Sequence, residues 1–366
     1  MKDKNVSFKL MKRLFINFLF LSSPFLLLAQ ATDYNNLDDW EHICYCSMNN
    51  SFHPTTIIQA DNNWQLLLTL KDGFTLKQLD SLKISYTQSQ LLLLRSQRLL
   101  NKTQNTYTTA IPILDSVQTT NLRKQSQLVA NNIYPEIEKE CRDLVSHLSE
   151  QGRSSNTFSI LFSYVFDGLI WERFEKDGIV KEKDGTGIWS GNYWFLIPKR
   201  PFHCGTNSLT SEEFVFRWNW SYVENVTDGL WGKNIDALFP LAQGKTVPSK
   251  EIIDEFSPLG VFDKNLNLTI PVINEKENNT LCLLSNKIIE KLLPAFLAKT
   301  DIDSLKLSYK FSDDSETVVI FYHEIMWDLM DLLLEKRVIQ MPTAFQSSDK
   351  ATLKDVADLC FIVIPK

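Results

Sequence analysis

Several features that would assign this sequence of 366 residues to a well-defined class of protein are scarce or missing. It has six cysteines, a density too low for a fold held together mainly by disulfides. It contains no glycine-rich phosphate loop, no Gly-x-Ser-x-Gly nucleophile turn and no EF-hand loop. The sequence therefore gives no motif for nucleotide binding, for serine hydrolysis or for calcium binding.

Long apolar runs are confined to the N-terminus. Three cations at positions 9, 12 and 13 precede a mostly apolar run at 14–28, which ends in Ala-Gln-Ala at 29–31. This order is typical of a secretory signal peptide. An uncleaved anchor is the alternative, but the run is shorter than the roughly 20 residues of a spanning helix. We predict that residues 1–31 are a signal peptide and that the protein is exported, to the periplasm or outside the cell. We expect no transmembrane span after its removal.

An excess of positive charge is also missing. The chain has 38 Lys and Arg against 44 Asp and Glu, a net charge of −6. Removing residues 1–31 takes away five cations and one anion, which leaves 33 against 43 and a net charge of −10. That sign opposes a general attraction to nucleic acid or to anionic lipid. The apolar content of 44% is that of a globular protein, so a packed core is expected.

What is present begins with a helix-rich segment at residues 64–115. An apolar helical stretch is followed by Thr75-x-x-Gln78, which has the spacing of a helix capping box. Ser85-x-x-Gln88 repeats that spacing ahead of a leucine-rich helix, and a strand follows after polar turn residues. The order of helix, short helix, turn, longer helix and strand resembles the winged-helix form of the helix-turn-helix domain.

The resemblance implies that the helix between Gln88 and Leu100 would read DNA, and the segment is locally basic. A DNA-reading helix, however, offers polar side chains to base edges, and the run from Leu91 to Leu94 leaves few positions for them. We therefore predict that this part serves protein contacts or packing. Nucleic-acid binding through residues 64–115 is the second alternative to the main functional hypothesis.

Two short motifs indicate an internal repeat. Ile-Pro-Ile-Leu begins at Ile111 and Ile-Pro-Val-Ile at Ile270, an offset of 159 that also places Pro135 on Pro294 and Phe162 on Phe321. Both stretches later end in an aliphatic run followed by Ile-Pro-Lys. We predict an α+β fold with a duplicated helix-plus-strand unit, the copies spanning about 105–200 and 264–366. The predicted domains are 34–200, with the winged-helix-like part and the first copy, and 201–366, with an aromatic strand and the second copy.

The aromatic strand is the first candidate binding site. Five aromatic residues alternate with other residues, a period of two that puts them on one face of a strand: Phe214, Phe216, Trp218, Trp220 and Tyr222. Such a face can bind sugar rings or an apolar patch of a partner, although it is more often part of a core.

Candidate catalytic residues are His203 and Cys204, in a polar loop before this strand. A thiol nucleophile needs a base within hydrogen-bond reach and a low pKa, and sequence neighbours rarely have that geometry. His323 begins a near match to the zinc-protease motif, but Trp327 stands where the second histidine is needed. We predict no metal site and no cofactor. Paired carboxylates such as Asp328 with Asp331 are expected on solvated helix surfaces.

The sequence thus favours an exported, soluble, non-catalytic binding module of the cell envelope, with an envelope protein or a glycan as its partner. The main alternative is a hydrolase or thiol-dependent enzyme that uses the loop of His203 and Cys204.

Overall fold

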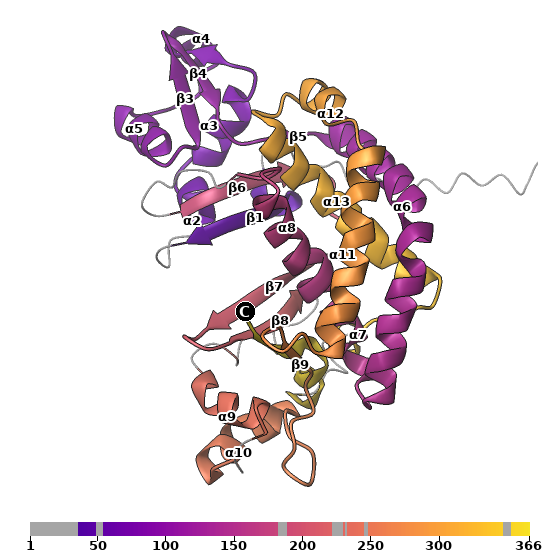
Figure 1. The fold of residues 1–366 in the computed structure, drawn as a ribbon. Coiled ribbons are helices and arrows are strands. Elements are labelled where there is room, and N and C mark those ends of the chain that lie inside the picture. Colours follow the sequence, from indigo (N-terminus) through magenta and orange to yellow (C-terminus); the bar gives the residue numbers. More distant parts are fainter. Residues whose placement is uncertain are drawn as a thin grey trace, which may run out of the picture.

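The computed structural model describes residues 36–48, 54–181, 189–221, 230, 233–244, 248–346 and 353–366. It is an α+β structure with three small sheets, which confirms the predicted fold class. Figure 1 shows the long helices on one side of the molecule and the sheets on the other.

The first sheet separates two hydrophobic cores. β1 (Glu41–Met48) runs antiparallel to β6 (Trp189–Leu196), and β5 (Ile113–Leu114) runs parallel to β6 on its other side. Trp194 of β6 belongs to the largest core, whereas its neighbour Phe195 belongs to a smaller N-terminal core. Successive side chains of a strand point to opposite faces, so one sheet closes both cores.

The N-terminal core lies under a compact group of short elements. These are η1 (Leu37–Asp39), α2 (Pro54–Gln59), α3 (Asn63–Leu70), α4 (Leu76–Ser81) and α5 (Gln88–Ser96), with a sheet of β2 (Phe74–Thr75), β4 (Thr106–Thr109) and β3 (Leu100–Thr103). The helices follow the predicted order, but the strands do not: β3 occupies part of the stretch expected to be a turn, and the single strand expected after it is divided between β4 and β5 (Ile113–Leu114).

The capping boxes of this part confirm one predicted position and correct the other. Thr75 and Gln78 cap α4 as expected. α5 is capped by Thr87 and Gln90, two residues after the predicted pair. The same side-chain spacing occurs at both places, and Thr87 has the extended backbone of an N-cap residue, at φ −119° and ψ 156°.

Three long helices form the layer behind the sheets. α6 (Ser116–Glu150) and α11 (Thr280–Lys299) pack against each other, and α13 (Asp314–Glu335) packs against α6 (Figure 1). Pro135 and Pro294 lie inside α6 and α11, which continue past them. α13 is buried on almost all sides, as expected of a central helix.

The second sheet has the order β7-β8-β10-β9, made by β7 (Cys204–Thr210), β8 (Val215–Ser221), β10 (Cys360–Ile364) and β9 (Val272–Asn274). One face packs on the largest core and the other on a third core that includes α9 (Phe239–Ala242) and α10 (Lys250–Phe256).

The connecting elements include a long π-helix, η3 (Ile160–Leu169), which continues into α8 (Ile170–Lys176). The remaining helices are η2 (Ser154–Asn156), α7 (Thr157–Ser159), η5 (Ile235–Leu238), η6 (Ser257–Leu259), α12 (Ile302–Tyr309), α14 (Thr343–Gln346) and η7 (Leu353–Leu359). Among the described residues, none of the helices combines the length and the apolar character that crossing a membrane would require.

The two predicted repeat copies contain elements in the same order. In the first, β5 leads into α6, then η3 with α8, then β6; in the second, β9 leads into α11, then α13, then β10. In each, the first strand is parallel to the last, and an additional strand (β1 or β8) pairs antiparallel with the last. The largest core draws side chains from both copies, and the duplication itself stays an interpretation.

Candidate functional site

Six buried or largely buried ionisable side chains meet where β1, α6 and α13 come together, and we call them the charge cluster. Glu41 comes from β1, Arg123 from α6 and Glu324 with Asp328 from α13, while Arg200 and His203 lie between β6 and β7. Glu41 and Glu324 have side chains that are fully inaccessible, and Arg200 is 9% exposed. Burying charges without partners is costly, so the geometry of their pairing decides what this cluster can do.

The two arginines bridge the three carboxylates. Arg123 places Nη2 at 2.6 Å from Glu41 Oε2 and Nε at 3.0 Å from Glu324 Oε2. Arg200 places Nη2 at 2.7 Å from the same Glu324 oxygen and at 3.2 Å from Asp328 Oδ1. These ion pairs hold β1, α6 and α13 at one point.

His203 and Ser126 complete the hydrogen bonding. His203 Nδ1 lies 2.6 Å from Glu41 Oε1, and Ser126 Oγ donates to Asp328 Oδ2 at 2.5 Å. Glu324 Oε1 is buried and has no hydrogen-bond partner among the described residues. All three arginine donors to Glu324 therefore converge on its other oxygen.

The pKa values of the carboxyl groups are moved in opposite directions. Burial by itself would raise the pKa of Glu41, but the hydrogen bond and charge of His203 and the charge of Arg123 bring it below its ordinary value. Burial raises the pKa of Asp328 to about 6, although Arg200 and the Ser126 hydroxyl oppose the shift. Of these two acids, Asp328 therefore takes up a proton more readily than Glu41.

Aromatic side chains close the cluster. The Arg200 guanidinium lies 5.3 Å from the ring centre of Trp327, and the His203 ring lies 4.6 Å from Trp327 and 5.5 Å from Trp220. Such contacts with aromatic faces favour a cation and exclude water. The charge cluster is thus a set of ion pairs, covered by aromatic rings, that joins β1, α6 and α13.

His203 and Cys204, the candidate catalytic pair, have side chains in different surroundings. His203 points Nδ1 at Glu41, and Cys204 is buried at 1% exposure with a pKa raised well above its usual value by that burial. A nucleophilic thiol needs a lowered pKa and access to substrate. The described geometry does not favour the thiol-enzyme alternative, which stays a prediction that thiol labelling tests.

The paired-carboxylate expectation was wrong for Asp328. We expected it to be solvated with Asp331, but Asp328 is 3% exposed and faces Arg200, while Asp331 is 68% exposed at the side chain. The members that the sequence did not identify as site residues are Glu41, Arg123, Arg200 and Glu324. The available signal was the i, i+4 spacing of Glu324 and Asp328 within a largely apolar stretch of helix.

The aromatic strand lies mostly in a core. Phe214, Phe216 and Trp218 are 1%, 0% and 0% exposed and belong to the third core. Trp220 is partly exposed and packs on His203, and Tyr222 lies outside the described residues. The face predicted as a candidate ligand surface is thus turned inward at three of its five positions.

Within the described ranges, no group of three or more His, Cys, Asp and Glu side chains is arranged to hold a metal ion. His323 is buried, its ring centre 4.8 Å from that of Trp171, and its Nδ1 lies 2.6 Å from the Val319 carbonyl oxygen. Burial lowers the pKa of His323, which therefore packs as a neutral ring.

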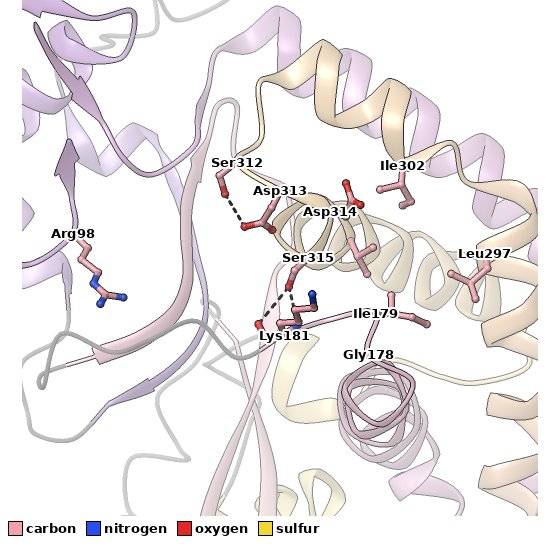
Figure 2. Close-up of a pocket in the computed structure, with 11 residues that line it drawn as sticks. Arg98, Gly178, Ile179, Lys181, Leu297, Ile302, Ser312, Asp313, Asp314 and Ser315 are labelled. Atoms are coloured by element: carbon pink, nitrogen blue, oxygen red, sulfur yellow. Dashed lines mark hydrogen bonds between the residues drawn. The ribbon is translucent and has the colours of Figure 1, made fainter. Parts of the chain in front are cut away.

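Three adjoining hollows lie beside the turn between α5 and β3. The largest has a volume of about 840 Å³, and Figure 2 shows Arg98 facing it from the N-terminal part, with Asp313 and Ser315 at the start of α13 across from it. Its aliphatic wall is made by Ile179, Leu297, Ile302 and Val318. It therefore offers both charge and apolar surface.

The other two hollows adjoin the first. One of about 330 Å³ shares Arg98 with it and is also lined by Asn101 and Asn192; one of about 400 Å³ shares Asn101 and is lined by Leu92 and Arg95. Because neighbouring hollows share lining residues, we call the three together the groove. Asn192 is 4% exposed, and its Oδ1 has no hydrogen-bond partner among the described residues.

Comparisons with known proteins found no matching family model, no matching curated protein and no matching solved structure. The function of this chain is therefore inferred from its own sequence and from the geometry of its sites.

Proposed function

We propose that this protein is an exported, non-catalytic binding module that holds a polypeptide segment of another envelope component in the groove. The observation that carries the proposal is the set of three adjoining hollows: the first and second share Arg98, and the second and third share Asn101. A compact small molecule would fill one hollow, whereas an extended chain can occupy all three.

The chemistry of the lining supports a polypeptide as the ligand. The largest hollow falls within the size range of ligand sites, about 300–1,000 Å³. Its Ile302 and Leu297 suit aliphatic side chains, and Arg98 suits a carboxylate or a carbonyl oxygen. The next hollow is lined by Asn101, an exposed residue whose side-chain amide can donate to or accept from the backbone of a peptide.

The non-catalytic part of the proposal is supported by the state of the candidate chemistry. His203 is held by Glu41 and packed on Trp327, and the Cys204 thiol is buried. His203 belongs to the charge cluster, and neither His203 nor Cys204 lines any of the three hollows of the groove.

The proposal is tested by photo-cross-linking in the cells that export the protein. A photoreactive phenylalanine analogue at Ile302, which lines the groove, is compared with one at Leu307, an 82% exposed residue of the same helix that lines none of its hollows. We expect a reproducible polypeptide adduct from position 302 and none from position 307. Equal labelling at both positions, or a glycan adduct at 302, contradicts the proposal.

Export is tested separately. The protein recovered from the envelope fraction or the medium should begin at Thr32 when its N-terminus is sequenced, because we expect cleavage after Ala31. A retained N-terminus contradicts signal cleavage and leaves the groove hypothesis to be tested in the cytoplasm.

A further inference from the structure

The end of the groove at α5 has a charge composition unlike the rest of the chain. Between Asp80 and Asp115 the sequence contains no Asp or Glu, and it has four cations: Lys83, Arg95, Arg98 and Lys102. The whole chain carries a net charge of −6. A local excess of one sign attracts a ligand of the other sign and orients it before contact.

The outer face of α5 adds apolar surface to this charge. Leu92 and Leu93 are 64% and 41% exposed, whereas Leu91 and Leu94 on the inner face are 2% and 0% exposed. Single exposed leucines are ordinary, but these two are consecutive, and Leu92 lines a hollow. Figure 1 shows α5 at the outer edge of the molecule, away from the long helices.

Cations flank the hollow next to these leucines. The hollow of about 400 Å³ is lined by Leu92, Arg95, Ser96, Leu100, Asn101 and Lys102. Lys102 lies over the Tyr107 ring, 5.2 Å from its centre, which holds its ammonium group on this side of the β3–β4 hairpin. The lining therefore offers two cations, two polar groups and two leucines to a side chain that enters the hollow.

We propose that this end of the groove binds an acidic and aliphatic segment of a partner protein. Carboxylates of the partner lie between Arg95 and Lys102, and an aliphatic side chain packs on Leu92 and Leu93. The inference rests on the proposed function, because it assigns the chemistry of the ligand at one end of the same groove.

Two other macromolecules fit the features less well. An anionic membrane would contact protruding cations and leucines but would not fill a hollow lined by Ser96 and Asn101. Nucleic acid would use polar side chains on the outer face of α5, where Leu92 and Leu93 stand instead. Both become measurable outcomes of the test.

The test measures binding of defined probes to the purified protein by fluorescence anisotropy or co-sedimentation. The probes are a labelled helical peptide of leucine and glutamate, the same peptide with lysine for glutamate, vesicles of phosphatidylcholine and phosphatidylglycerol, and a random-sequence DNA duplex. We expect binding of the glutamate peptide, weaker binding of the lysine peptide, and no binding of vesicles or duplex that depends on Leu92 and Leu93.

Two variants and two controls locate the interaction. The double variant R95E with K102E should weaken binding of the glutamate peptide by a factor of about ten or more, which corresponds to about 1.4 kcal/mol. It should strengthen binding of the lysine peptide. The double variant L92S with L93S should weaken binding of both peptides. Leu307→Ser on α12 and Lys139→Glu on α6, 82% and 76% exposed and outside the groove, should change neither.

Equal binding of the two peptides, or insensitivity to R95E with K102E, overturns the inference. Vesicle or duplex binding that those changes abolish, without peptide binding, also overturns it and identifies the other ligand class. Because the cross-link at Ile302 is scored independently, a polypeptide adduct there with a negative peptide result leaves the proposed function standing and removes only this inference.

Discussion

The sharpest consequence of the charge cluster is the effect of replacing Asp328 by asparagine on the pH dependence of stability. Asp328 is 3% exposed, and its pKa is about 6 in the folded protein against 3.8 when unperturbed. A folded pKa above the unfolded one means that the folded state binds more protons between these two values. Stability contributed by this group is therefore present at low pH and is lost as the pH rises from about 4 to about 6.

The magnitude follows from the difference of about two pKa units. At roughly 1.4 kcal/mol per unit, the ionised Asp328 lowers the free energy of unfolding by about 3 kcal/mol at pH 7 relative to its protonated form. Asp328→Asn keeps the shape and removes the titration. The free energy of unfolding of the variant, minus that of the wild type, should rise by about 3 kcal/mol between pH 4 and pH 7.

The assay is urea unfolding followed by the fluorescence of the nine tryptophans, at several pH values in this range. The Glu41 carboxyl has a lowered pKa, so its contribution is lost as the pH falls, but it is present in both proteins and largely cancels from the difference. Asp303→Asn, at a position 91% exposed, is the control and should stay within about 0.5 kcal/mol of the wild type. A difference for Asp328→Asn that is flat, or that falls with rising pH, refutes the reasoning.

Three further measurements test other parts of the structure. Arg200→Met leaves Glu324 and Asp328 buried without this cation, so it should lower the free energy of unfolding by about 3–5 kcal/mol in urea titration, and Arg200→Lys should recover only part because an ammonium group does not replace the guanidinium fork. Iodoacetamide should label the exposed Cys44 in the folded protein well before the buried Cys204, as read by peptide mass; faster labelling of Cys204 would revive the enzyme alternative. Thr87→Ala should lower the free energy of unfolding by about 1 kcal/mol, because α5 loses its cap. A loss smaller than that caused by Ser85→Ala would contradict the cap assignment.

Local patterns in the sequence located elements better than they located the site. The order of the helices from α3 to α5 follows from capping boxes and turn residues, which act within a few residues, whereas β3 was expected to be a turn. The two-residue error at the start of α5 arose because Ser85 and Thr87 both stand three residues before a glutamine. The choice between them depends on where the chain leaves α4, which is a tertiary constraint.

The charge cluster could not be assembled from the sequence because its members come from distant elements. Glu41 and Arg123 are brought together by the pairing of β1 with β6 and by the packing of α6 against α13. An isolated carboxylate on a helix is normally solvated, and that general rule gave the wrong environment for Asp328. The aromatic alternation of β8 was recognised correctly as a strand face, but sequence alone did not decide whether it faced solvent or a core.

The position of the cluster also bears on the repeat. At the offset of 159, Glu324 corresponds to Val165 and Asp328 to Leu169, so the two carboxylates of α13 have aliphatic counterparts in η3. Arg123 of α6 corresponds likewise to Cys282 of α11. These three members of the charge cluster therefore occupy positions at which the two predicted copies differ. Shared positions, such as Phe162 and Phe321, lie in the common core. If the copies share an origin, the shared positions account for their similar fold, and the differing positions hold one copy against the other in a single arrangement, because a buried ion pair is stable only with its own partners.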